Sequence, residues 1–133
     1  AYLRPCELMS LHVVDLLAPA ISISPFWTLL ICPSTRTSRT NVGESDDSIR
    51  LDAKRLLWID RVLLILKLRP QGLLWSFDYA QFCSMMKRVN ALTGLKVVPY
   101  QARHSGPSID RAENVRTQEE VQKRGRWKSH RSL

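Results

Sequence analysis

The chain has 133 residues, and 44% of them are apolar, which is enough for a folded core and excludes a largely disordered chain. Lysine and arginine outnumber the acidic residues by 20 to 12, so the formal net charge is +8. That charge favours a polyanionic partner, nucleic acid first and an anionic membrane surface second. A basic protein with no such partner is the plain alternative.

The first part of the chain predicts a short helix followed by a small sheet. Residues 4–12 have a proline suited to a first helical turn and two leucines on one side. Residues 20–31 alternate and then become rich in strand-forming side chains, and Ser48–Asp52 alternates again after a polar loop. These two extended runs predict a small antiparallel sheet.

The rest of the chain predicts four helices, over residues 53–68, 78–93, 99–114 and 118–124. In the second of these, an apolar stripe at helical spacing is expected to face the core: Tyr79, Phe82, Cys83, Met86 and Val89. Pro107 predicts a break or kink near residues 105–107 of the third. Thr117 and Glu120 match a capping box, and Gly125 ends the last helix. The fold class is therefore α+β and mostly α.

The cysteines and the longest apolar run bear on the cellular compartment of the protein and on whether it spans a membrane. Cys6, Cys32 and Cys83 are far apart and lack metal-site spacing, so we expect small buried side chains, no metal, and a reducing, intracellular compartment. Residues 16–33 are interrupted by prolines and serines, and the clean part is too short to span a bilayer. The first residue is Ala1 rather than methionine, which suggests a fragment.

Three short motifs follow one another along the chain: "YLRPCEL" near the start, "YQARHSGPS" near residue 100 and "RGRWKS" near the end. Together they resemble the catalytic domain of tyrosine recombinases, the phage-integrase family of DNA breaking-and-rejoining enzymes. The resemblance implies one catalytic domain over residues 1–133, a mostly helical fold with a three-stranded antiparallel sheet, and double-stranded DNA as partner. It implies no cofactor and no metal, because the chemistry proceeds through a covalent 3′-phosphotyrosine.

The resemblance assigns the catalytic roles to four residues: Arg4, Tyr100, Arg103 and Trp127. Attack on a phosphodiester builds negative charge on the two non-bridging oxygens, and two guanidiniums can hold both oxygens. Arg4 matches the first arginine of the family and Arg103 the second, while Trp127 matches a position whose indole N–H contacts the phosphate. The supporting residues are Glu7, beside the first arginine, and His104, a structural helix residue. Residues expected to bind DNA phosphates are Arg39, Lys123, Arg124, Arg126 and Lys128. Each of these basic and aromatic residues has an ordinary structural or solvent-exposed alternative.

The sequence also departs from the family pattern. Tyr100 stands where histidine is usual, and Arg39 stands near the place of the hairpin lysine, although an arginine holds its proton too tightly to act as an acid. The expected nucleophilic tyrosine would follow Trp127 by about nine residues in the family spacing, beyond Leu133, and no core-binding domain precedes Arg4. We therefore expect a truncated domain that is inactive in DNA cleavage.

Three functions remain open at this point. The first is a site-specific recombination or DNA-integration domain, for which a homo-oligomer of the full-length protein on DNA and a nucleus or nucleoid are the expected setting. The second is a non-catalytic DNA-binding module derived from the same fold, which the missing hairpin lysine favours. The third is a helical protein-interaction domain that never meets DNA. The DNA target site and the biological role do not follow from the sequence.

Overall fold

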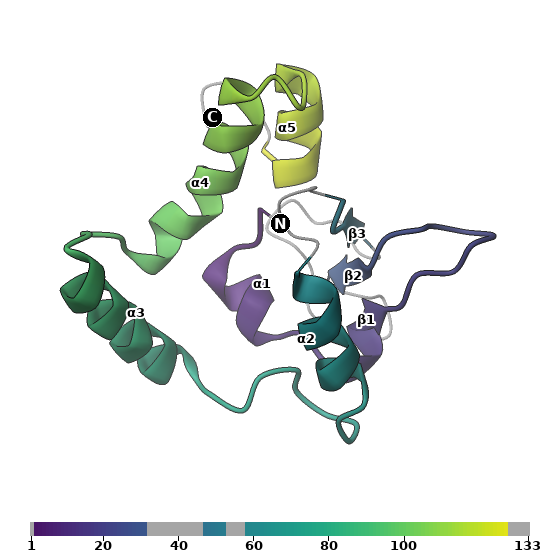
Figure 1. Cartoon of the computed structure of the whole chain (residues 1–133), viewed down its shortest axis with the longest axis horizontal. Coiled ribbons are helices and arrows are strands. Elements are labelled where there is room, and N and C mark those ends of the chain that lie inside the picture. Colours follow the sequence, from purple (N-terminus) through teal and green to yellow (C-terminus); the bar gives the residue numbers. More distant parts are fainter. Residues whose placement is uncertain (1, 32–46, 53–57, 128–133) are drawn as a thin grey trace. The chain divides into compact units, whose positions relative to one another are not determined.

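The computed structural model describes residues 2–31, 47–52 and 58–127, and the chain divides into two compact units (Figure 1). Unit 1 comprises Ala1–Leu8 and Phe77–Leu133, and unit 2 comprises Met9–Ser76. The described residues are mostly helical and include one small three-stranded antiparallel sheet, so the expected α+β class is confirmed. Within those residues, no helix is long and apolar enough to cross a bilayer.

Unit 2 is built around the sheet. Its strands β1 (Leu16–Leu17), β2 (Thr28–Ile31) and β3 (Asp47–Arg50) lie in the order β1-β2-β3. Leu29 in the central strand pairs with Leu16 on one side and Ile49 on the other, so apolar side chains of all three strands stand in one row. A short 3₁₀ helix (Val13–Asp15) precedes β1, and α2 (Ile59–Lys67) follows the sheet. The buried apolar residues of this unit are Leu11, Val13, Leu16, Trp27, Leu29, Ile31, Ile49, Leu63 and Leu74.

Two of the expected elements of the first half differ in extent. The first helix, α1, covers only Pro5–Met9. The alternating run from Ala20 to Ser24 is a tight turn rather than a strand, because Ala20 N–H bonds to the Ser24 carbonyl at 2.9 Å and leaves Ile21 and Ile23 exposed. Alternation alone does not make a strand when no neighbouring strand pairs with it. For the expected helix over 53–68, residues 53–57 lie outside the described part.

Unit 1 contains three of the four helices that the second half predicts. α3 (Tyr79–Thr93) is capped by Asp78, whose side chain accepts the Gln81 N–H, and it ends at Gly94 with φ of 71°. α4 (Pro99–Ala112) passes through Pro107 without a break, so the predicted break is wrong. Proline removes only one helical donor, and Pro107 is buried, so packing holds the helix across that gap. α5 (Gln118–Gly125) begins at the capping box of Thr117 and Glu120.

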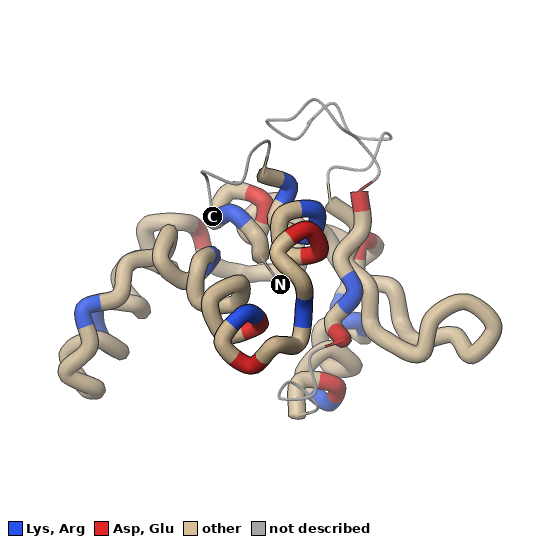
Figure 2. Tube along the Cα trace, turned by 90° about the horizontal axis from the view of Figure 1, so that it is seen from above, with Lys and Arg blue, Asp and Glu red and all other residues tan. Residues whose placement is uncertain are grey.

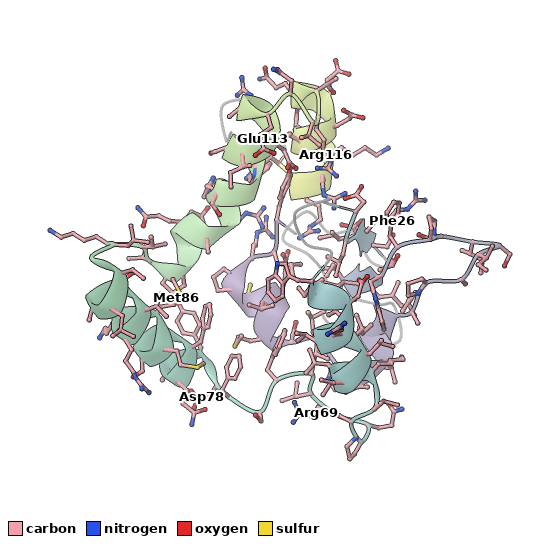
Figure 3. All side chains as sticks on the ribbon, in the orientation of Figure 1. Phe26, Arg69, Asp78, Met86, Glu113 and Arg116 are labelled. Atoms are coloured by element: carbon pink, nitrogen blue, oxygen red, sulfur yellow. The ribbon has the colours of Figure 1, made fainter. Side chains whose placement is uncertain are left out.

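The apolar stripe of α3 is not a buried core in the described structure. No residue of α3 is buried, and Tyr79 and Val89 are about half exposed at 52% and 49%. Met86, labelled on α3 in Figure 3, is only partly covered. Cys6 is exposed and Cys83 partly so, which corrects the expectation of buried thiols; Cys32 lies outside the described residues. Helical periodicity identifies an apolar face but does not say what covers it.

Candidate functional site

Three arginines of unit 1 gather around one buried carboxylate, and we call Arg4, Glu7, Arg103 and Arg126 the Glu7 centre. Glu7 Oε2 accepts from Arg126 Nη2 at 2.5 Å and lies 3.7 Å from Arg103 Nη1. Glu7 Oε1 lies 3.6 Å from Arg4 Nη1. The formal charges of these four side chains sum to +2, so the centre as a whole attracts anions.

Three segments that are remote in sequence supply this centre. Glu7 belongs to α1, and its carboxylate also accepts the backbone N–H of Arg4 at 2.7 Å, which fixes the start of that helix. Arg103 comes from the middle of α4, and α4 packs on α5. Arg126 follows α5 in the left-handed conformation, with φ of 54°. The two arginines that the sequence singled out, Arg4 and Arg103, therefore meet on the same carboxylate.

Arg103 is almost completely enclosed, with 2% of its surface exposed. Its Nη1 donates to the Tyr2 carbonyl at 2.9 Å, and its Nη2 donates to the Gly125 carbonyl at 2.5 Å. Its guanidinium carbon lies 4.9 Å from the centre of the Trp127 ring. Burial lowers the pKa of Arg103, the neighbouring Arg4 acts in the same direction, and Glu7 opposes both. In this conformation Arg103 holds three segments together, whereas the side chain of Arg4 remains 20% exposed.

Gly125 is what allows Trp127 to cover Arg103. A Cβ atom at Gly125 would lie 1.8 Å from the nearest atom of the Trp127 ring, which no side chain can occupy. Gly125 was expected only to end a helix. The second reason for this glycine, direct contact with an aromatic ring two residues later, was missed by the sequence analysis.

The aromatic residues expected at the site form one row in unit 1. The rings of Tyr100 and His104 are 5.0 Å apart, and those of His104 and Trp127 are 5.8 Å apart. Tyr100 is 58% exposed, whereas His104 and Trp127 are partly buried. Edge and face contacts of this kind fix the ring of His104 between its neighbours. The structure thus brings Tyr100, His104 and Trp127 beside Arg103.

A second buried polar group supports the same unit and was not anticipated. Asp110, 2% exposed, accepts the hydroxyl of Tyr2 and also accepts from Arg116 Nη1 at 2.5 Å. Burial and the bond to Asp110 raise the pKa of Tyr2 above its ordinary value, so this phenol keeps its proton. Asp110 follows Arg103 by two helical turns, so the sequence did place it on the same face of α4. Figure 3 labels Arg116 in the connection between α4 and α5.

The residues expected to contact DNA phosphates are distributed unevenly. Lys123 is exposed, and Arg124 is partly exposed with its guanidinium carbon 5.7 Å from the centre of the Tyr2 ring. Arg126, expected at the surface, is instead 7% exposed and paired with Glu7. Figure 2 shows the positions of Lys and Arg along the described chain. Arg39 and Lys128 lie outside the described residues.

Comparison with known proteins adds no relative. No protein-family model matches the chain, and neither the curated proteins nor the solved structures include a significant match. Over residues 2–31, 47–52 and 58–127, no group of three His, Cys, Asp or Glu side chains lies close enough to hold a metal ion.

Proposed function

We propose that unit 1 binds the phosphodiester backbone of double-stranded DNA, in the manner of a tyrosine-recombinase catalytic domain. The observation that carries this proposal is the meeting of Arg4 and Arg103 on Glu7, from two motifs that are remote in sequence. A buried guanidinium beside a partly exposed one concentrates positive charge where a phosphate can approach. The net charge of +8 supports a polyanionic partner.

The reaction that this arrangement suits is phosphoryl transfer. A tyrosine oxygen would bond to phosphorus as the bond between phosphorus and the 5′ oxygen breaks. The phenol would lose its proton to solvent, the leaving 5′ oxygen would take a proton from solvent, and the products would be a 3′-phosphotyrosine and a free 5′ hydroxyl. Arg4 would contact the non-bridging oxygens first, with the phenol of Tyr100 and the indole N–H of Trp127 as further donors. Tyr2 is not a candidate nucleophile, because it is buried and donates its hydroxyl to Asp110.

A non-catalytic DNA-binding module is the second candidate, and the burial of Arg103 favours it. Both terminal nitrogens of Arg103 already donate to backbone carbonyls, so a phosphate reaches this guanidinium only if Trp127 and Gly125 move. A module of this kind would use Arg4 and the exposed cations without carrying out chemistry. Incubation with a nicked duplex tests the non-catalytic alternative, because a covalent protein–DNA adduct on a denaturing gel would show that a tyrosine of this chain attacks DNA and would overturn that alternative.

The direct test is binding of a short fluorescein-labelled duplex, measured by anisotropy across a sodium chloride series. We expect strongly salt-dependent binding. Arg4→Ala should weaken it by about tenfold or more, because a hydrogen bond to a charged group is worth about 1.5–3 kcal/mol. Arg88→Ala is the matched control, because it removes the same charge from an exposed position on α3. If the two variants weaken binding equally, Arg4 has no special role. If the protein does not bind the duplex at all, the proposal is wrong and a protein-interaction domain using the exposed face of α3 replaces it.

A further inference from the structure

A polar hollow of about 380 Å³ lies beside the second half of α4. Its lining includes His104, Pro107, Ser108, Arg111 and Ala112. This volume falls at the lower end of the range of small-molecule sites, roughly 300–1,000 Å³. None of the motifs that suggested the recombinase resemblance assigns a role to Ser108 or Arg111.

The hollow continues the aromatic row along the same helix. His104, Ser108 and Arg111 are spaced four and three residues apart, so they lie on one face of α4. Helical rise places Arg111 about 12 Å along the axis from Arg103. Successive phosphates of one DNA strand are about 3.4 Å apart along the duplex axis. A strand that lies along α4 from the Glu7 centre therefore presents a later phosphate to Arg111.

Arg111 differs from Arg116 and Arg126, which follow it in the chain. Arg116 is paired with Asp110, and Arg126 with Glu7. Arg111 is exposed and makes no ion pair with any described residue, so its guanidinium is available to a ligand. The hydroxyl of Ser108 donates to the His104 carbonyl at 2.9 Å, so Ser108 forms the wall of the hollow while Arg111 supplies its charge.

We propose that the α4 hollow binds a second backbone phosphate of the DNA strand that lies on the Glu7 centre, with Arg111 as its cationic ligand. This inference rests on the proposed DNA binding of unit 1. It predicts the path of the bound DNA strand, which would follow α4 from Tyr100 towards Arg111. It also adds a contact that the recombination motifs do not contain.

The test compares Arg111→Ala with Arg88→Ala and Arg4→Ala on the same labelled duplex over the salt series. Loss of one phosphate contact should reduce the slope of log affinity against log salt by about 0.9 for Arg111→Ala. Arg88→Ala should leave the slope close to that of the wild-type protein, and Arg111→Lys should restore most of it. Arg111 is exposed on a helix, so the alanine variant should fold, which circular dichroism checks.

A localised readout separates this inference from the proposed function. In amide NMR spectra, addition of the duplex should shift the Ser108 and Arg111 resonances and leave those of Lys87 and Arg88 on α3 unchanged. The proposed second phosphate site is wrong if Arg111→Ala and Arg88→Ala give the same salt slope and the Ser108 amide does not shift. This conclusion does not depend on the result for Arg4→Ala. If Arg4→Ala also has no special effect, the proposed function fails as well.

Discussion

The two units bury different kinds of side chain. Unit 2 has a conventional apolar core around its sheet, and Asp15 is its one buried charged residue among those the structure describes. Unit 1 has few buried apolar side chains, chiefly Tyr2 and Val121. Pro107 is buried as well, and four further buried side chains are charged: Glu7, Arg103, Asp110 and Arg126. The same chain thus stabilises one unit by apolar packing and the other by enclosed ion pairs and hydrogen bonds.

The difference is informative because buried ion pairs are an inefficient way to gain stability. Removing two charges from water costs several kcal/mol per ion, and a well-packed apolar replacement of the same volume is often at least as stable. The three arginines around one carboxylate are therefore weak evidence for stability, and they are compatible with the proposed phosphate binding. The comparison makes unit 1 the part of the chain in which the proposed DNA binding is best tested.

The largest effect should follow from Glu7→Gln. This change keeps the volume of the side chain but leaves Arg103 and Arg126 enclosed without the carboxylate that balances them. Removing one member of a buried pair typically costs about 3–5 kcal/mol. Urea unfolding monitored by circular dichroism gives the change in the free energy of unfolding, and hydrogen exchange of α4 amides assigns it to unit 1.

Glu119→Gln is the control for this change, because Glu119 is an exposed carboxylate in the first turn of α5. Its loss should cost no more than about 1 kcal/mol, the usual value of an acidic residue at a helix start. A similar small loss for Glu7→Gln would mean that the Glu7 centre does not hold unit 1 together. The contrast between the two units would then lose its energetic basis.

Gly125→Ala should have a smaller effect that is confined to the cover over Arg103. The new methyl group overlaps the Trp127 ring, and overpacking of this kind costs about 1–3 kcal/mol. With fluorotryptophan incorporated, the ¹⁹F resonance of Trp127 should shift. The resonances of the three tryptophans of unit 2 should stay in place: Trp27, Trp58 and Trp75.

Gly106→Ala is the control for Gly125→Ala, because it adds the same methyl group at a less crowded position of unit 1. A Cβ at Gly106 would lie 3.0 Å from two atoms of the Tyr2 ring, which is tight but can be relieved by a small shift. Its cost should therefore be below that of Gly125→Ala. If Gly106→Ala proves the more damaging, or if Gly125→Ala leaves the Trp127 resonance unmoved, the account of Gly125 is wrong.

Local chemistry explains which parts of the fold the sequence predicted. The Asp78 and Thr117 caps and the Gly94 stop act within a few residues, and α3 and α5 begin and end where these signals stand. The pairing of β2 with β3 also followed from strand-forming residues around a polar loop. The continuity of α4 through Pro107 did not, because it depends on contacts that burial of this proline supplies.

The sequence predicted which residues lie together at the site, but it did not predict which of them are buried or what they contact. Motif order indicated that Arg4, Glu7 and Arg103 belong together, and they do meet. Burial could not be predicted: Arg126 resembled a surface cation, yet its left-handed backbone turns it onto Glu7. The role of Tyr2 was hidden because its partner, Asp110, lies at the far end of the sequence. Such contacts depend on long-range packing, which no local pattern records.

The smallest effect should be the response of α5 to acid. The backbone N–H of Thr117 donates to Glu120 Oε2 at 2.7 Å, and this bond, with the Thr117 side chain, holds the pKa of Glu120 below its usual 4.5. A carboxylate with a depressed pKa stabilises the fold at higher pH, and this contribution is lost as the pH falls below 4.5 through the folded-state pKa.

Protection factors of α5 amides, measured from about pH 5 to about pH 3, report this loss. They should fall in the wild-type protein and in Glu119→Gln, which keeps the pair of Thr117 and Glu120. In Glu120→Gln they should vary less, because a glutamine amide can cap the helix without titrating. An equal fall in all three proteins would assign the acid sensitivity to another carboxylate.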